Sequence, residues 1–404
     1  MRPFLLCNPT TSMPNLSISL TRHSPSRPAH RLGKAALLCA TLFQLACSGV
    51  TSRPDEVPEP PAADVVTPQL PVQLSFAAVG DIMLGTDYPT GRLPEDPGTL
   101  LAPVAELLSG ADATFGNLEG VLMDGGEARK QCANPTRCYV FRSPSTYATT
   151  LANAGFDLLS LANNHARDFG EEGRDASMRA LDAVGIRHSG RVGDVARWQQ
   201  SGLNLAMVAF APFGGSHDML DMVSGQSLIE SMASQSDILV VSFHGGAEGA
   251  DKTALPFASE EFHGENRGDV VAFAHMAVEA GADLVIGHGP HVPRALELYQ
   301  GRLIAYSLGN FVTYQGINVS GVNGLAPILL ATLDSDGRFV QGQIHSTQQQ
   351  RPRGPIPDPE HQAARLMRAL TLNDFPNGHL VINDEGYISV KPSPAASASL
   401  GASP

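Results

Sequence analysis

Residues 281–292 read GADLVIGHGPHV, and this stretch decides the fold that the sequence predicts. An apolar run of strand length ends in two histidines, as expected of a buried strand with functional side chains at its carboxyl end. Residues 75–81, SFAAVGD, repeat the pattern near the start of the chain, with an aspartate in the final place. Two distant strands that end in metal-ligand residue types indicate one site at the carboxyl edge of a sheet.

Three further apolar runs end in the same way. They cover residues 113–116, 158–162 and 238–243. Ligands of open α/β sheets bind beyond the carboxyl ends of the strands, so we expect all five ends to meet in one crevice. The side chains at these ends are Asp81, Asn117, Glu119, Asn163, Asn164, His165, His244, Glu248, His288 and His291.

Helix-like stretches alternate with these runs, and the alternation predicts a layered α/β domain with partly parallel strands. The helix-like stretches are residues 101–108, 145–154, 175–184, 270–280 and 361–370.

The clustered residue types favour a divalent cation. Carboxylate, amide and imidazole groups bind Zn, Mn, Mg or Fe, and the lack of cysteine among them disfavours a structural zinc site. A pair of such ions about 4 Å apart activates water and stabilises both reacting oxygens in phosphoryl transfer. We therefore expect one or two divalent ions.

Charge and the N-terminus indicate where the protein works. The formal net charge of -13 disfavours binding to nucleic acid. Arg31 and Lys34 precede an apolar run, residues 35–46, that is too short to span a membrane and is typical of a secretory signal. We expect export to the periplasm or cell envelope. Cys47 follows this run as in a lipoprotein cleavage box, so lipidation there and an ordinary cysteine of a signal region both remain open.

Cys132 and Cys138 lie outside the signal region. In an oxidising compartment they could close a small loop as a disulfide. A metal site is the weaker alternative, because no second cysteine or histidine pair lies nearby at ligand spacing.

Seven blocks of the sequence resemble signature blocks of the bacterial capsule-synthesis (CapA) family, named for poly-γ-glutamate capsules. They are residues 80–85 (GDIMLG), 117–120 (NLEG), 139–144 (YVFRSP), 160–165 (SLANNH), 244–248 (HGGAE), 281–292 and 306–311 (YSLGNF). That family is similar in fold to the calcineurin-like metallophosphoesterases. The resemblance implies a four-layer α/β/β/α sandwich, with two mixed sheets flanked by helices.

The resemblance also implies roles for single residues. His165 is the catalytic residue, aimed at a substrate phosphate. The implied metal ligands are Asp81, Glu119, Asn164, His244, His288 and His291, and the implied substrate contacts are Arg142, Glu248 and Asn117. For Arg142, a structural salt bridge is an equal alternative. Asn163 is expected to be scaffold, and Asn310 to support a loop.

Two departures from the phosphoesterase pattern bear on catalysis. Met83 stands where that pattern has a histidine ligand, and only Glu119 can replace the bridging aspartate. One metal, or two of uneven affinity, would fit such a site.

We expect five segments along the chain. Residues 1–47 are a signal segment, 48–72 a flexible linker, 73–345 the CapA-like domain, 346–391 a C-terminal extension packed on it, and 392–404 a disordered tail.

Two functions from different classes remain. The first is a metal-dependent hydrolase of phosphoester or related bonds in envelope polymers. The second is a non-catalytic factor that binds metal or polymer in the synthesis or export of an anionic polymer, working with membrane-bound capsule synthesis proteins. A fold that binds ligand without metal is a third option.

Overall fold

The computed structural model describes residues 72–132 and 138–391. The predicted signal segment with Cys47, nearly all of the predicted linker and the tail 392–404 lie outside the described residues, and the predicted segment boundaries stay predictions. No helix in the described ranges is long and apolar enough to cross a membrane.

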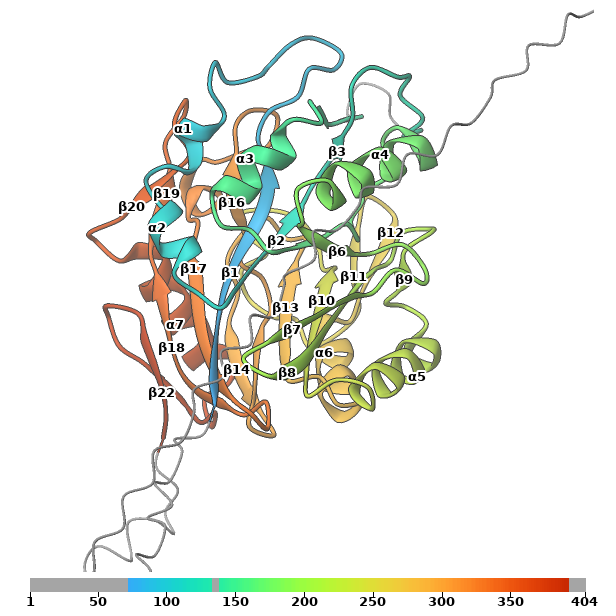
Figure 1. The fold of residues 1–404 in the computed structure, drawn as a ribbon. Coiled ribbons are helices and arrows are strands. Elements are labelled where there is room, and N and C mark those ends of the chain that lie inside the picture. The colour runs from blue at the N-terminus through green and yellow to red at the C-terminus, as the bar shows by residue number, and fades with distance from the viewer. Residues whose placement is uncertain (1–71, 133–137, 392–404) are drawn as a thin grey trace, which may run out of the picture. The chain divides into compact units, whose positions relative to one another are not determined.

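Two mixed β-sheets form the centre of the described part (Figure 1). In the first sheet β1, β2, β5 and β6 run parallel. On the side of β1 away from β2, β17 pairs antiparallel with its first half and β16 lies parallel beside its end, and β18, β22 and β21 continue antiparallel from β17. In chain order its strands are β1 (Gln73–Met83), β2 (Ala113–Leu118), β5 (Leu158–Ser160), β6 (Arg187–Ser189), β16 (Asn310–Thr313), β17 (Ile328–Asp334), β18 (Phe339–His345), β21 (Leu380–Ile382) and β22 (Tyr387–Val390).

The second sheet has a parallel centre and antiparallel edges. Strands β8, β10, β13 and β15 are parallel neighbours, while β7 and β14 pair antiparallel at the two edges. Its strands are β7 (Ala196–Gln200), β8 (Leu203–Ala211), β9 (His217–Asp218), β10 (Ile238–His244), β13 (Leu284–His288), β14 (Leu296–Tyr299) and β15 (Arg302–Ala305).

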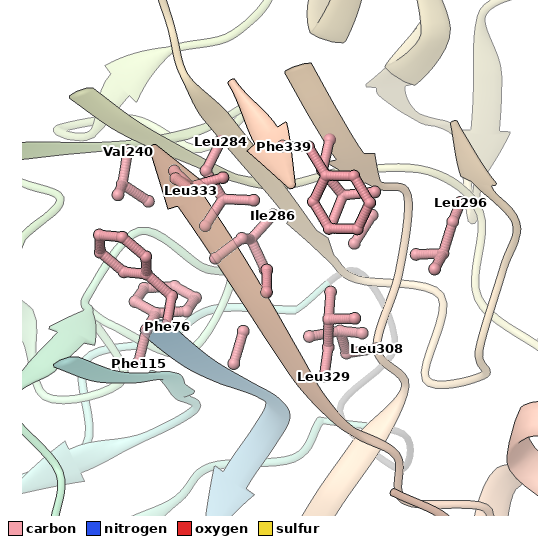
Figure 2. Packing of buried hydrophobic residues seen from close by; sticks show 14 of the residues in the cluster. Phe76, Phe115, Val240, Leu284, Ile286, Leu296, Leu308, Leu329, Leu333 and Phe339 are labelled. Atoms are coloured by element: carbon pink, nitrogen blue, oxygen red, sulfur yellow. The ribbon is translucent and has the colours of Figure 1, made fainter. Parts of the chain in front are cut away.

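The main core lies between the two sheets (Figure 2). Phe76 and Phe115 point into it from the first sheet, and Val240 and Ile286 point into it from the second. Each is at most 2% exposed. Burial of one such side chain contributes about 1.5–3 kcal/mol, so this layer is a major source of the stability that holds the two sheets together.

Helices cover the two outer faces. Apolar side chains of the first four helices pack with β1, β2 and β5, and those of α5 and α6 pack with β8, β10 and β13. The helices are α1 (Gly98–Leu101), α2 (Ala105–Ser109), α3 (Tyr147–Asn153), α4 (Gly170–Asp182), α5 (Met222–Ala233), α6 (Val270–Glu279) and α7 (Gln362–Asp374). The order helix, sheet, sheet, helix that the resemblance implied is confirmed.

Local sequence explains where several helices begin and end. Asp221 and Asp269 accept backbone N–H groups of the first turns of α5 and α6, which satisfies donors that a helix start leaves free. The single helix predicted over residues 101–108 is wrong, because α1 and α2 are separate short helices there. Pro103 lies between them, and proline has no N–H to continue a helix.

Helix α7 joins the two sheets at one side. Ala364 and Met367 belong to the core between the sheets, and Leu370 packs with the outer core of the second sheet. The helix contacts β14 of the second sheet and β18 of the first.

Candidate metal centre

The register of the parallel strands brings the predicted site residues together. Asp81 of β1 lies opposite Asn117 of β2 and Asn310 of β16 in the first sheet. In the second sheet His244 of β10 lies opposite His288 of β13. All five residues are at most 1% exposed. The strand ends therefore deliver them side by side at one edge of the sandwich, as the sequence predicted.

A chain of amide hydrogen bonds fixes the arrangement at the centre of this cluster. The carbonyl of Leu118 can only accept, and the N–H of His165 can only donate, so they orient the amide of Asn163. Asn163 Nδ2 then donates to Asn117 Oδ1 at 3.1 Å. Asn117 Nδ2 in turn donates to Asp81 Oδ1 at 2.9 Å.

The same amide group reaches the second sheet. Asn117 Nδ2 lies 3.3 Å from His244 Nδ1, which must accept because an amide nitrogen only donates. His244 is thus neutral, with its proton on Nε2, in this arrangement. Burial is the main reason that the pKa of His244 falls well below its usual value.

His291 connects three carboxylates. Its Nδ1 donates to Asp81 Oδ2 at 2.9 Å and to Asn310 Oδ1 at 3.0 Å. Its Nε2 faces Glu119 Oε1 at 3.6 Å and Glu248 Oε2 at 3.8 Å. Ligand atoms of Asp81, Glu119 and His291 all lie within 4.8 Å of one another, a separation that one metal ion can bridge.

The charges of this cluster depend on one another. Burial would raise the pKa of Asp81, but the hydrogen bond and charge of His291 outweigh it and lower that pKa to about 2. Burial lowers the pKa of His291, but Glu119, Asp81 and Glu248 together raise it well above the usual value. The carboxylate of Glu119 has no hydrogen-bond partner among the described residues, and its burial is the main reason that its pKa rises to about 8.

Several buried atoms of metal-ligand type lack hydrogen-bond partners within the described ranges. They are both carboxylate oxygens of Glu119, Oδ1 of Asn164, Nε2 of His244 and Nδ1 of His288. A buried polar atom without a partner costs about 1–3 kcal/mol, so such a concentration at one strand edge needs an explanation. A divalent cation bound by oxygen and nitrogen donors fits this set of residues.

His165 lies beside the cluster in a second hydrogen-bonded group. Its Nδ1 donates to Asp168 Oδ2 at 2.7 Å, and its ring stacks on Phe141 with centroids 4.3 Å apart. Lys130 Nζ lies 3.2 Å from Asp168 Oδ1. Burial lowers the pKa of His165, and the charge of Asp168 opposes this. A carboxylate only accepts, so the 2.7 Å contact with Asp168 favours the proton on His165 Nδ1 and leaves Nε2 as an acceptor. Lys130 Nζ, 3.2 Å from the same Nδ1, then interacts with Asp168 instead.

A pocket of about 370 Å³ opens above these groups. We call it the acidic pocket. It is lined by Glu119, Glu248, His165, His291, Phe141 and Tyr139, among others. Glu248 Oε1 accepts from Arg267, so this carboxylate is held at the pocket wall.

Two predicted substrate contacts have a different place in the structure. Arg142 pairs with Asp87 at 2.6 Å and does not line the acidic pocket. Asn117 is fully buried and orients Asp81 and His244. The substrate contacts predicted for both residues stay predictions.

Asn163 and Asn310 support the site as the sequence predicted. Asn163 holds the turn after β5, and Asn310 Nδ2 donates to three backbone carbonyls, including that of His291. Asn164 lines a second pocket, next to the acidic one. Asp168 and Lys130 were missed, since their approach to His165 depends on a loop contact; the spacing of Asp168 three residues after His165 was the available signal.

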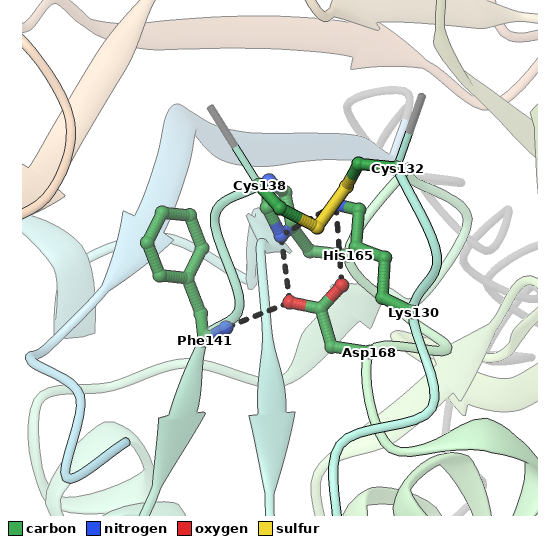
Figure 3. The surroundings of a disulfide bond; sticks show 6 residues. All are labelled: Lys130, Cys132, Cys138, Phe141, His165 and Asp168. Carbon is green, nitrogen blue, oxygen red and sulfur yellow. Dashed lines mark hydrogen bonds and ion pairs between the residues drawn. A yellow bond between two sulfur atoms is a disulfide. The ribbon is translucent and has the colours of Figure 1, made fainter. Parts of the chain in front are cut away.

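Cys132 and Cys138 form a disulfide (Figure 3). Figure 3 shows the bond close to Lys130, Phe141, His165 and Asp168. The bridge thus closes the loop that leads from Lys130 to Phe141, both of which contact the His165 group.

Two curated relatives are both named CapA proteins of capsule or PGA biosynthesis. The chain is 28% identical over 266 residues to the capsule biosynthesis protein CapA of Bacillus anthracis, which covers 60% of this chain and 61% of that protein. It is 26% identical over 262 residues to the PGA biosynthesis protein CapA of Bacillus subtilis, which covers 60% and 64%. The match thus spans less than two thirds of the length of either relative.

A 5'-nucleotidase precursor from Thermus thermophilus is a solved structure with a distant likeness. It is 11% identical, covers 75% of this chain and 59% of that chain, and has a TM-score of 0.37. So low a score supports no argument about function.

The family comparison is more specific. Residues 75–315 match the family described as bacterial capsule synthesis protein PGA_cap. That range contains all five strand ends, Asp81, Glu119, His165, His244 and His291 included. By this match, the chain belongs to the PGA_cap family of bacterial capsule synthesis proteins.

Proposed function

We propose that this protein is a metal-dependent, phosphoesterase-like hydrolase that acts in the synthesis of an anionic envelope polymer such as poly-γ-glutamate. The observation that supports it most is the cluster of Asp81, Glu119 and His291, whose ligand atoms lie within 4.8 Å of one another under an open pocket. The names of the relatives supply the biological setting of capsule synthesis.

Asp81, Glu119 and His291 would hold the ion, with Nδ1 of His288 as a further donor, because His288 Nε2 donates to the carbonyl of Val79. The ligand roles predicted for His244 and Asn164 stay predictions. A bound divalent ion would act as a Lewis acid toward a phosphoryl or carbonyl oxygen. Mn, Zn, Fe or Mg would each suit these donors. Two ions are harder to accommodate, because Asn117 is an amide committed to hydrogen bonds with Asp81 and His244.

His165 would move the proton. Asp168 fixes the proton on Nδ1, and Nε2 remains an acceptor beside the acidic pocket. There it can accept a proton from an attacking water and return it to the leaving oxygen. Glu248, held by Arg267, also lines this pocket and would repel a misplaced anionic group.

The test is metal content together with hydrolysis. The purified protein, grown with Mn, Zn and Fe, should hold about one divalent ion and hydrolyse a chromogenic phosphodiester. Asp81→Asn should lose the metal and at least a hundredfold in rate, whereas His165→Ala should keep the metal and lose about a hundredfold. A wild-type protein without metal and without activity on several phosphodiesters would sink the proposal.

A non-catalytic role is the second candidate, and one observation favours it. Position 83 is Met and position 117 is a buried amide, so two places of the phosphoesterase pattern have no ligand. Such a site would bind metal and polymer without turnover. Polymer production in cells that rely on His165→Ala separates the two: normal production favours binding, and lost production favours catalysis.

We also propose that the protein is exported to the cell envelope and attached there only through lipid at Cys47. The basic and apolar residues before Cys47 are the support. A Cys47→Ser protein that stays in the membrane fraction as wild type does would contradict the anchor.

A further inference from the structure

A second pocket of about 310 Å³ lies on the other side of the turn that holds His165, and we call it the cationic pocket. Arg129, Lys130, Arg167 and Arg174 line it, together with Asn163 and Asn164. Two consecutive residues of one turn thus face different pockets, because Asn164 lines the cationic pocket and His165 lines the acidic pocket.

Arg174 is the unusual member. Its side chain is 2% exposed, yet it makes one hydrogen bond, from Nη1 to the carbonyl of Gly215. Its Nε has no partner, and in residues 72–132 and 138–391 no carboxylate lies within 4 Å of its guanidinium. A buried charge without a counter-charge is costly, so it is seldom kept without a use.

The nearby carboxylates are engaged elsewhere. Glu171 pairs with Arg167 at 2.7 Å and with Arg191 at 2.8 Å. Asp175 also pairs with Arg191. Asp168 pairs with Lys130.

The cationic pocket therefore keeps a surplus of positive charge. Arg129 is exposed and, among the described residues, makes no ion pair, so it adds to the charge of Arg174 at this pocket. The first residue of α4, Gly170, lines the pocket too, and the start of a helix favours an anion.

A glycine leaves room for the guanidinium of Arg174. An added Cβ on Gly215 would lie 3.3 Å from both terminal nitrogens of Arg174. Gly215 also has a φ of +85°, which side chains other than glycine rarely adopt. A larger residue here would press on the guanidinium.

We propose that the cationic pocket binds an oxyanion of the substrate, a phosphate or carboxylate group next to the one that reacts in the acidic pocket. Arg174 supplies the buried guanidinium, and Arg129 and Lys130 add charge at the mouth. The substrate class is then a polyanion with at least two acidic groups. This inference rests on the proposed function where it identifies the bound anion as part of a substrate. Binding of an anion at the pocket can be measured independently of that function.

The experiment is calorimetric titration of the purified protein in EDTA at constant ionic strength, so that no metal competes for the anion. One arm uses inorganic phosphate and the other a short γ-linked glutamate oligomer. Arg174→Met should weaken binding at least tenfold, about the effect of one charge-assisted bidentate contact. The matched control is Arg179→Met, which removes the same charge from the exposed face of α4 and should change binding less than twofold.

Stability gives an independent readout. Because Arg174 has no counter-charge, ligand-free Arg174→Met should unfold at the wild-type temperature or above it. If this variant does not fold, Arg129→Met replaces it, since Arg129 is exposed, and an affinity loss of about threefold is expected.

The two arms identify the anion. Dependence on Arg174 for phosphate alone assigns a phosphorylated substrate, and dependence for the oligomer assigns a polycarboxylate. Wild-type affinity for both probes in Arg174→Met and Arg129→Met overturns the inference.

The proposed function fails separately. Metal content and phosphodiester turnover of the wild-type protein test the proposed function by themselves. A wild-type protein without metal or turnover refutes only the proposed function, whereas wild-type anion affinity in Arg174→Met refutes only this inference.

Discussion

Two buried arginines in this protein have opposite surroundings. Arg294 is fully buried, and its two terminal nitrogens donate to Glu260 at 2.7 Å each, while Nε donates to the carbonyl of Lys252. Arg174 is as deeply buried but has one carbonyl partner. The charge of Arg294 is neutralised by the fold, whereas the charge of Arg174 is left for something else. The difference separates a structural arginine from one kept for a ligand.

The largest expected effect concerns the structural arginine. Arg294→Met leaves Glu260 buried without its counter-charge, so the free energy of unfolding should fall by about 3–5 kcal/mol. Urea denaturation measures it, with Arg179→Met as the control for loss of surface charge. A decrease of less than about 1 kcal/mol in the free energy of unfolding would contradict the view that Arg294, unlike Arg174, stabilises the fold.

The next effect concerns a buried carboxylate without a partner. Burial raises the pKa of Glu119 to about 8, from 4.5 in the unfolded chain. The folded state therefore keeps a proton that the unfolded state has lost, and this stabilisation disappears as pH rises from about 5 to 8. In EDTA, Glu119→Gln should thus gain about 2–4 kcal/mol over wild type between pH 5 and pH 8.

Thermal unfolding at several pH values checks this, and excess Mn should reverse the order of the two proteins, because a carboxylate binds the ion more strongly than an amide does. A constant difference across the pH range would show that Glu119 is ionised in the metal-free protein. The comparison with Arg174, as a second buried ionisable group without a partner in the described residues, would then fail.

A smaller effect is expected from the disulfide. Cys132 and Cys138 are separated by six positions, and opening so short a loop costs about 2 kcal/mol in the chain-entropy view. Lys130 lies just before the bridge and lines the cationic pocket, so a Cys132→Ser, Cys138→Ser protein should also bind phosphate two- to threefold more weakly. Calorimetry on that protein is the measurement; unchanged affinity would separate the bridge from the pocket.

The smallest expected effect concerns Lys130, which lines a pocket as Arg174 does but is ion-paired as Arg294 is. Lys130 lines the same pocket as Arg174 but is paired with Asp168. Asp168→Asn removes the counter-charge, so phosphate should bind about two- to threefold more tightly in EDTA, while hydrolysis falls about tenfold because His165 loses its partner. Asp384→Asn, which breaks the exposed ion pair with Arg368, is the control. Weaker phosphate binding in Asp168→Asn would contradict the view that a cationic side chain binds phosphate only when no carboxylate of the protein pairs with it.

The sequence predicted the strand ends well. Asp81, His244 and His288 each end an apolar run, and the parallel register then brings them to one edge. That outcome depends on short-range pattern and on the general geometry of parallel sheets. Pattern and sheet geometry were thus enough to predict that these side chains meet.

The remaining site features depend on contacts between distant loops. Arg142 follows a strand-like block, but its partner Asp87 could not be known without the fold. Arg174 looks in sequence like any charged residue of an amphipathic helix. Only its 2% exposure and the missing counter-charge set it apart.

The position of β17 has a consequence for anyone who wishes to cut the protein. The family match stops at residue 315, yet β17, residues 328–334, is the direct antiparallel neighbour of β1 in the middle of the first sheet. Truncation at residue 315 would leave one edge of β1 with bare N–H and C=O groups and would remove α7 from the side of both sheets. The region matched by the family should therefore not fold well by itself, and expression should include residues to at least 391.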